Sequence, residues 1–111
     1  MAAPVVKRAI TSFYYRASLA RELPRMFYVY ILLCGDGKLY TGYSASLRER
    51  MRQHERGEVF ATKGRLPVRL VFYEAFVVAS DAKRRERYLK TTAGKRALRL
   101  MLRDCFDGRC G

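Results

Sequence analysis

The stretch Phe27-Tyr-Val-Tyr-Ile-Leu-Leu-Cys-Gly-Asp-Gly-Lys-Leu-Tyr-Thr-Gly-Tyr43 predicts a β-hairpin around which the rest of the chain is arranged. Its first half, residues 27–34, is rich in aromatic and β-branched residues, and residues 38–43 resume an alternating pattern. Between them, Gly35-Asp-Gly37 supplies residues that tolerate the positive φ of a tight turn.

Two tyrosines of this hairpin, Tyr30 and Tyr40, are expected to share one face of the sheet. If residues 35–37 form a three-residue loop, Leu32 faces Tyr40 and Tyr30 faces Gly42. A two-residue loop would place the two phenols on opposite faces. The turn chemistry favours the three-residue loop, and therefore a pair of phenols on one surface.

Length and charge limit the possible functions. The chain has 111 residues, half of them hydrophobic, which suits one folded domain and excludes overall disorder. Its net charge is +13, from 23 Lys and Arg against 10 Asp and Glu, so nucleic acid is the expected partner; solubility alone is the alternative explanation. No apolar stretch approaches the roughly 20 residues of a membrane-spanning helix, so no membrane partner is expected.

The cysteines predict neither a disulfide framework nor a zinc site. Cys34, Cys105 and Cys110 are three in number, and His54 is the single histidine. This composition is typical of a reducing compartment, so we expect a cytoplasmic protein.

The chain divides into three parts at the sequence level. Residues 1–25 are basic and contain one acid, which predicts a poorly ordered N-terminal extension; organelle targeting by this segment is the minor alternative. Residues 26–102 form the expected domain, and residues 103–111 a C-terminal tail without a clear pattern. The oligomeric state is open, either a monomer or a weak dimer.

A helix is predicted after the hairpin, over about residues 47–56. Ser46 and Glu49 have capping-box spacing, and Gly57 is suited to end the helix. Its inward stripe carries two polar residues, Arg50 and His54, beside Leu47 and Met51. On the outer face, Arg48 and Arg52 are candidates for phosphate contact, although such residues are more often solvated.

The second half of the chain alternates between strand and helix patterns. A loop over residues 58–66 has the basic tip Thr62-Lys63-Gly64-Arg65, either a phosphate contact or an ordinary solvated loop. Residues 68–78 are apolar on both faces and predict a well-buried strand. A helix over 82–90, capped by Ser80 or Asp81, carries the stripe Ala82, Glu86, Leu89 and Ala93. Gly94 is expected to interrupt the helical pattern. A further helix is predicted over residues 95–102, and its inward residues are Ala97, Leu98, Met101 and Leu102. The pattern predicts an α/β protein of the α+β type.

The exceptional positions form one set: two tyrosines on one face, an arginine and a histidine one helical turn apart, and a glutamate on an apolar stripe. Singly, each has an ordinary structural explanation, such as a core hydroxyl or a surface ion pair. Together they suit phosphodiester cleavage, which needs an oriented water, a cation for the developing charge and a carboxylate for a hard metal.

These residues resemble the GIY-YIG nuclease superfamily. Tyr28-Val29-Tyr30 and Tyr40-Thr41-Gly42 stand where its two motifs would be. The likeness continues through Leu47 to His54, Thr62 to Pro67 and Arg85 to Lys90, in the family's order and spacing. It covers about residues 26–100 and is similar to the small stand-alone bacterial branch that consists of one such domain.

The resemblance implies a three-stranded antiparallel sheet flanked by helices, and it implies roles for particular residues. Glu86 would bind Mg²⁺ or Mn²⁺, Tyr40 would orient and deprotonate the attacking water with help from Tyr30 or His54, and Arg50 would stabilise the phosphate charge. Candidate nucleic-acid contacts are Tyr43, Arg48, Arg52, Lys63 and Arg65. Tyr43 replaces a lysine of repair-enzyme relatives, and the chain contains no asparagine, although many relatives have one at the site.

Three functional hypotheses follow. The leading one is a metal-dependent endonuclease acting on DNA, with branched or single-stranded forms as candidate substrates and repair or recombination as the candidate process. The alternatives are a non-catalytic nucleic-acid-binding module that retains the fold, and an accessory domain that docks on a larger partner.

Overall fold

The computed structural model describes residues 23–109, so the predicted N-terminal extension lies almost wholly outside the described residues. The elements in chain order are β1 (Phe27–Leu33), β2 (Leu39–Ser44), α2 (Leu47–Glu55), a 3₁₀ turn (Lys63–Arg65), β3 (Arg69–Phe76), α3 (Ala79–Leu89), α4 (Thr92–Met101) and a π-helical turn (Cys105–Arg109).

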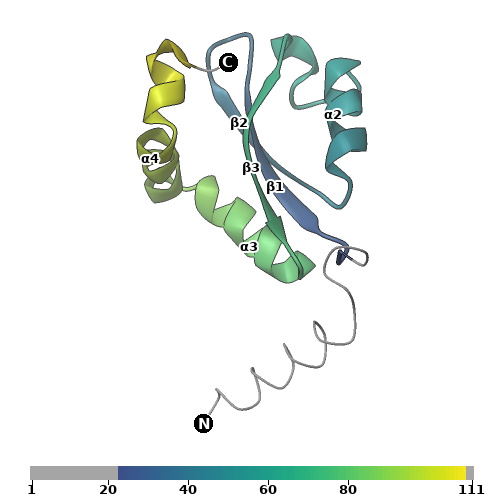
Figure 1. Cartoon of the computed structure of the whole chain (residues 1–111). Helices are drawn as coiled ribbons and strands as arrows, with labels where there is room; N and C mark the ends of the chain where they lie inside the picture. The colour runs from purple at the N-terminus through teal and green to yellow at the C-terminus, as the bar shows by residue number, and fades with distance from the viewer. Residues whose placement is uncertain (1–22, 110–111) are drawn as a thin grey trace.

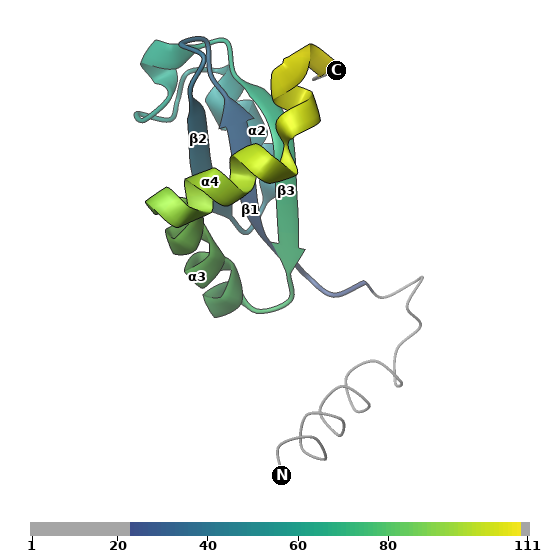
Figure 2. The same ribbon diagram turned by 90° about the vertical axis from the view of Figure 1, so that its left-hand side faces the viewer.

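The sheet has three antiparallel strands in the order β2-β1-β3, with helices on both faces. Helix α2 covers one face, while α3 and α4 lie against the other (Figure 1). Seen at right angles, α4 crosses in front of the sheet and α2 lies behind it (Figure 2). The predicted α+β class with a three-stranded antiparallel sheet is therefore confirmed.

The hairpin has the register expected for a three-residue loop. Tyr30 pairs with Gly42 and Leu32 with Tyr40, so both phenols lie on the α2 face. The Cys34 amide donates to the Lys38 carbonyl at 2.9 Å and closes the turn. Gly37 has a φ of +81°, a conformation that glycine adopts without a steric penalty.

The two faces of the central strand β1 form two separate cores. On the α2 face, Leu47 and Met51 pack against Tyr30 and Leu32. On the other face, the buried cluster contains Val29, Ile31, Ala82, Leu89 and Leu98. Full burial of one such aliphatic side chain stabilises the fold by about 1.5–3 kcal/mol. Helices therefore pack on both faces of the sheet, and alternating residues of β1 belong to one core or the other.

Strand β3 differs from its prediction as a well-buried strand. It lies at an edge of the sheet, and none of its residues is fully buried; Tyr73 is 52% exposed and Leu70 38% exposed. An apolar pattern on both faces does not distinguish a central strand from an edge strand, and β1 occupies the centre. The bidentate pair between Arg85 and Glu74, at 2.8 and 3.2 Å, ties α3 to this edge strand.

The caps of α2 and α3 differ from prediction. Ser46 makes no side-chain cap hydrogen bond, and Glu49 pairs with Arg52; the Ser46 amide donates to the Ser44 hydroxyl, which in turn donates to the Ser46 carbonyl. Gly57 follows α2 with a φ of +72°, as its predicted role requires. Helix α3 begins at Ala79, so Ser80 and Asp81 lie inside its first turn and do not cap it.

Gly94 does not interrupt a helix, contrary to prediction. It lies inside α4, which begins at Thr92 and is capped by the Thr91 hydroxyl accepting from the Gly94 amide at 3.1 Å. A Cβ atom at this position would overlap the backbone of Tyr88 and Leu89, so glycine permits the close approach of α4 to α3. Leu98 is buried as predicted, whereas Ala93 and Met101 are exposed.

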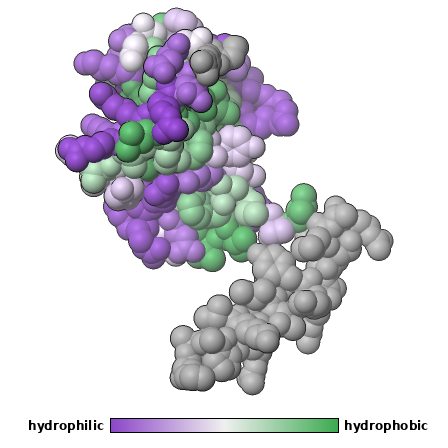
Figure 3. All heavy atoms as spheres, turned by 60° about the vertical axis from the view of Figure 1, so that its left-hand side comes forward, coloured by the Kyte–Doolittle hydropathy of each residue, from purple (hydrophilic) through white to green (hydrophobic). Residues whose placement is uncertain are grey.

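The cysteines also differ from the expectation of fully reduced thiols. Cys34 is free and buried, but Cys105 is disulfide-bonded; Cys110 lies outside the described residues. Cytoplasmic localisation stays a prediction. On the α3 and α4 side, hydrophobic residues are visible between hydrophilic ones (Figure 3). Within residues 23–109, no helix has both the length and the apolar character needed to cross a bilayer.

Candidate active site at the β2 edge

A buried histidine joins two hydroxyl groups beneath α2. His54 Nε2 lies 2.8 Å from the Tyr30 hydroxyl, and Nδ1 lies 2.7 Å from Thr62 Oγ1. All three residues have 0% relative exposure. A neutral imidazole has one donor and one acceptor nitrogen, and a hydroxyl can complement either. Both ring nitrogens are therefore occupied, and the orientation of the Tyr30 hydroxyl is fixed.

The pKa values of this network identify its resting protonation state. Burial, reinforced by the nearby Arg50 cation, lowers the pKa of His54, so the imidazole is neutral at pH 7. Burial also raises the pKa of Tyr30 to about 12, although the hydrogen bond from Arg50 opposes this rise. Neither group is free to accept a proton from a bulk water. Their geometry instead suits positioning.

Arg50 connects the buried network to the surface. Its Nε donates to the Tyr30 hydroxyl at 3.4 Å, and its Nη1 donates to Gln53 Oε1 at 2.9 Å. The hydrogen bond with Tyr30 is the main cause that raises the pKa of Arg50, and Tyr40 lies close enough to add to it. A hollow of about 230 Å³ adjoins the guanidinium, with Arg50, Gln53 and Tyr43 among its lining residues.

Tyr40 is the phenol of the pair that reaches solvent. Its ring centroid lies 6.3 Å from that of Tyr30 and 5.5 Å from that of His54. Unlike Tyr30, it is only half-buried. The two tyrosines predicted to share a role therefore have different environments: one is locked inside and the other stands beside Arg50 at the surface.

Gly42 explains how the buried phenol reaches the edge of the sheet. The Tyr30 ring lies directly over Gly42, and a Cβ atom there would overlap the ring and its hydroxyl. Because β2 is an edge strand, this places the Tyr30 hydroxyl toward the margin of the sheet. Any side chain at residue 42 would displace the phenol from His54 and Arg50.

Glu86 comes from the opposite face of the sheet. It lies on α3, between the buried residues Ala82 and Leu89, and its side chain is 21% exposed. Lys90 Nζ pairs with it at 3.2 Å. The carboxylate also lies close enough to add to the raised pKa of Tyr30, for which burial is the main cause. Glu86 is therefore within electrostatic range of Tyr30 from the opposite face of the sheet, and its joining Tyr40 and Arg50 in one site stays a prediction.

A divalent metal could bind Glu86 in one mode, with water and substrate oxygens as its other ligands. Among residues 23–109, no group of three or more His, Cys, Asp and Glu side chains could hold an ion. Mg²⁺ usually keeps several waters and binds through one or two carboxylates plus substrate phosphates. A single, partly accessible Glu86 suits that mode, whereas a closed protein cage is excluded for the described residues.

The predicted nucleic-acid contacts have unequal surroundings. Tyr43 lies beneath the Lys83 ammonium, which is 5.3 Å from its ring centroid. Lys63 is exposed and stands 4.9 Å from the Phe60 ring centroid. Arg48 is exposed on α2, and exposed Arg52 pairs with Glu49 at 3.5 Å.

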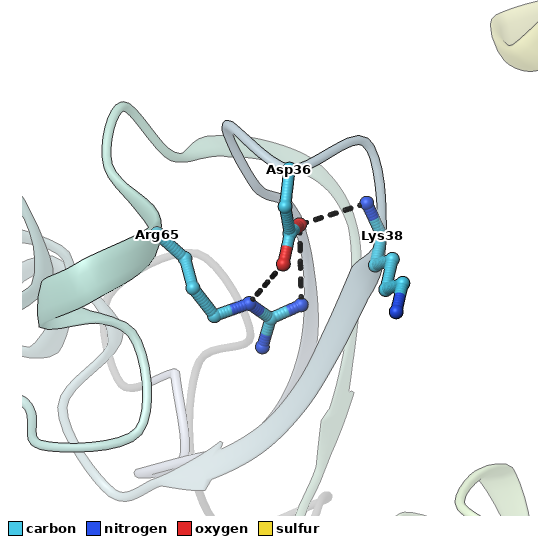
Figure 4. A network of polar contacts seen from close by, with 3 residues as sticks. All are labelled: Asp36, Lys38 and Arg65. Carbon is cyan, nitrogen blue, oxygen red and sulfur yellow. Dashed lines mark hydrogen bonds and ion pairs between the residues drawn. The ribbon is translucent and has the colours of Figure 1, made fainter.

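Arg65 has a structural partner in the hairpin turn. Its Nε donates to Asp36 Oδ2 at 2.7 Å, and its Nη2 donates to Asp36 Oδ1 at 3.4 Å (Figure 4). The same carboxylate accepts the Lys38 amide at 2.9 Å. Asp36 therefore joins the hairpin turn to the 3₁₀ segment Lys63–Arg65.

Thr62 is the site residue that sequence reasoning missed. It was expected at the polar tip of a loop, either as part of a phosphate contact or as solvated surface, yet it is fully buried against His54. An inward histidine whose second nitrogen needs a partner was the available signal.

The variant Thr62→Val should lower the free energy of unfolding by about 1–3 kcal/mol, because it leaves His54 Nδ1 buried without a partner. Urea denaturation at pH 7.5 measures the change. Thr92→Val is the matched control, since Thr92 is exposed at the start of α4. Equal and small effects of both substitutions would contradict a structural role for the Thr62 hydroxyl.

The fold and the family comparison together define a class: the protein contains a nuclease domain. The chain belongs to the GIY-YIG family, because residues 26–99 match the family model described as the GIY-YIG catalytic domain. Nucleic acid is the substrate class of this family, and its nucleases generally use divalent metals.

Its relatives are small bacterial proteins. The UPF0213 protein of Staphylococcus aureus (strain Mu3) is 43% identical over 75 residues, covering 67% of this chain and 92% of the relative. A UPF0213 protein of S. aureus strain Mu50 matches equally. The solution NMR structure of the UPF0213 protein BH0048 from Bacillus halodurans has 38% sequence identity and a TM-score of 0.46, covering 68% of this chain and 84% of that one.

Proposed function

We propose that the protein is a divalent-metal-dependent endonuclease that hydrolyses phosphodiester bonds in DNA. The proposal extends to branched or single-stranded DNA as the preferred substrate and to a role in repair or recombination. One observation supports it: in a member of a nuclease family, Arg50 lies beside Tyr30 and Tyr40, and the carboxylate of Glu86 is within electrostatic range of Tyr30.

In the proposed mechanism, Glu86 would hold the ion, which when bound supplies positive charge to the phosphate and the leaving oxygen. Arg50 places its guanidinium at the hollow beside the β2 edge, where it stabilises the negative charge that develops on the phosphate. Tyr40, the accessible phenol, would act in its phenolate form: its oxygen orients the attacking water and accepts the proton that the water loses. Tyr30 holds Arg50 through its hydroxyl.

His54 has a positioning role in this proposal. Its ring has no exposed surface, and both nitrogens are hydrogen-bonded to protein hydroxyls. A general base must lie within hydrogen-bond reach of the proton that it removes. His54 therefore acts through Tyr30 and does not contact the attacking water.

A non-catalytic nucleic-acid-binding module is the second candidate. It is favoured by the complete absence of asparagine from the chain, since many relatives have a site asparagine. It predicts binding that weakens steeply with salt and no cleavage under any metal condition.

The two candidates are separated by incubating the protein with supercoiled plasmid, single-stranded circular DNA and a branched oligonucleotide, in Mg²⁺, Mn²⁺ or EDTA. We expect nicking or linearisation only with a divalent metal. Cleavage that persists in EDTA would contradict metal dependence, and salt-sensitive binding without cleavage in any metal would establish the binding module.

A further inference from the structure

A second concave surface lies on the far side of α2 from the candidate active site. This α2–β3 groove has a volume of about 680 Å³, and its lining includes Tyr28, Ser46, Arg48, Arg52, Leu70 and Tyr73. That volume falls within the range of about 300–1,000 Å³ typical of small-molecule sites. None of the residues Tyr30, Tyr40, Arg50, His54 and Glu86 lines it, so it lies outside the candidate catalytic set.

The floor of the groove is aromatic and uncovered. Tyr73 pairs with Tyr30 across β1 and β3, so it lies on the α2 face, beyond the reach of α2. Its side chain is 52% exposed, and its ring meets Tyr28 edge to face with centroids 6.0 Å apart. Exposed aromatic rings on a sheet face serve as stacking platforms for nucleic-acid bases, because every base has a π-face.

The wall of the groove is mainly basic. Arg48 is exposed and has no ion pair or hydrogen bond within the described part of the chain. Arg52 pairs with Glu49 at 3.5 Å, an exposed contact of the weak surface type that a phosphate could replace. Glu55 is the acid in the lining. With a chain charge of +13, this surface suits a polyanion.

The groove is continuous with the candidate active site. Ser46 lines both the α2–β3 groove and the 230 Å³ hollow beside Arg50. A chain that leaves the hollow can therefore pass the start of α2 and enter the groove without crossing the body of the helix. A nucleic-acid strand bound at Arg50 has a path to Tyr73.

We propose that the α2–β3 groove binds an unpaired segment of the substrate strand, with one base stacked on Tyr73, whose ring meets Tyr28 edge to face, and a backbone phosphate on Arg48. A base inside a duplex has both ring faces covered by neighbouring base pairs, so only an unpaired base can use this platform. The proposal rests on the proposed function in taking nucleic acid as the substrate, and it assigns single-stranded DNA as the class that the groove selects.

The test is fluorescence anisotropy of a labelled twelve-nucleotide oligothymidine and of a mixed-sequence duplex, with the full chain in EDTA so that cleavage plays no part. Tyr73→Ala should weaken single-strand binding by about five- to 150-fold, as loss of one stacked base does. Tyr73→Phe, which keeps the ring, should bind as the unchanged protein does. Duplex binding should change less than twofold in both variants.

Arg48→Gln gives an independent second variant on a surface helix. It should lower the magnitude of the single-strand salt slope by about 0.7, the value for one phosphate contact. Matched controls are Tyr88→Ala, a 41% exposed tyrosine on α3, and Arg99→Gln, an exposed arginine on α4. Circular dichroism melting verifies that each variant is folded.

The outcomes test the groove assignment separately from the proposed nuclease activity. If single-strand binding depends on Tyr73 and Arg48 but no DNA is ever cleaved, the proposed function fails and the groove assignment stands. If cleavage occurs but both variants bind oligothymidine normally, the groove assignment is overturned. Failure of the unchanged chain to bind oligothymidine, or equal losses in Tyr88→Ala and Arg99→Gln, would also overturn it.

Discussion

The variant Glu86→Gln is expected to cleave DNA at least about 10³-fold more slowly than the unchanged protein. A bound metal supplies several kcal/mol of charge stabilisation in the transition state, and each 1.36 kcal/mol is a factor of ten. Glutamine keeps the size of the side chain and a hydrogen bond to Lys90, but it removes the charge. Single-turnover cleavage in Mg²⁺ measures the rate, and Mn²⁺ titration followed by electron paramagnetic resonance measures the lost ion.

The stability of this variant should change little. The pair between Glu86 and Lys90 lies at the surface on one helix, with Lys90 55% exposed, and such i,i+4 pairs contribute about 0.3–0.5 kcal/mol. Asp81→Asn on the same helix is the control, because it makes the same change in net charge. Cleavage by Glu86→Gln at the unchanged rate would mean that the activity belongs to another nuclease or that the metal is held elsewhere.

The hairpin was the most predictable part of the molecule because its geometry is local. Loop length fixes the register, and the turn residues 35–37 fix loop length, so the pairing of Tyr30 with Gly42 followed from a short stretch. The inward positions of Arg50 and His54 followed from helical periodicity alone. These local features also contain the motifs by which the sequence resembles the GIY-YIG family, and the family model confirms that resemblance.

Features that depend on tertiary contacts were not predictable. Strand β3 is at the edge because β1 pairs with both other strands, which its own apolar sequence does not encode. Thr62 is polar in a polar segment, and its burial depends on a histidine eight residues earlier. Glycine often ends a helix, but Gly94 lies against the backbone of Tyr88 and permits close packing of α4 on α3.

Tyr30 and Tyr40 have different surroundings, so they have different roles in the proposed mechanism. Sequence reasoning treated Tyr30 and His54 as assistants or rivals of Tyr40 in proton transfer. Burial raises the pKa of Tyr30 to about 12 and lowers that of His54, so the first stays protonated and the second stays neutral at pH 7. In the proposed mechanism both residues support Arg50, and the accessible Tyr40 is the group that contacts the attacking water.

Tyr40→Phe should therefore lower kcat by about 10²- to 10⁴-fold, the range for loss of a general base, with KM changed by less than about threefold. The ring and its contacts with His54 are kept, so the free energy of unfolding should stay within about 0.5 kcal/mol. Tyr30→Phe should lower kcat less, by about 10- to 100-fold, through displacement of Arg50. Steady-state cleavage of a short fluorescent substrate gives both constants.

The pH dependence of kcat separates Tyr40 from His54 as the base. If His54 were the base, Tyr40→Phe would stay active and its rate would rise with pH across the titration of His54, whose pKa burial lowers from its usual value of about 6.5. If Tyr40 is the base, the residual rate of Tyr40→Phe should show no such rise, because both His54 nitrogens are already bonded inside the protein. An active Tyr40→Phe enzyme whose rate rises with pH below about 6.5 would transfer the catalytic role to His54 and would require its ring to leave Thr62 during the reaction.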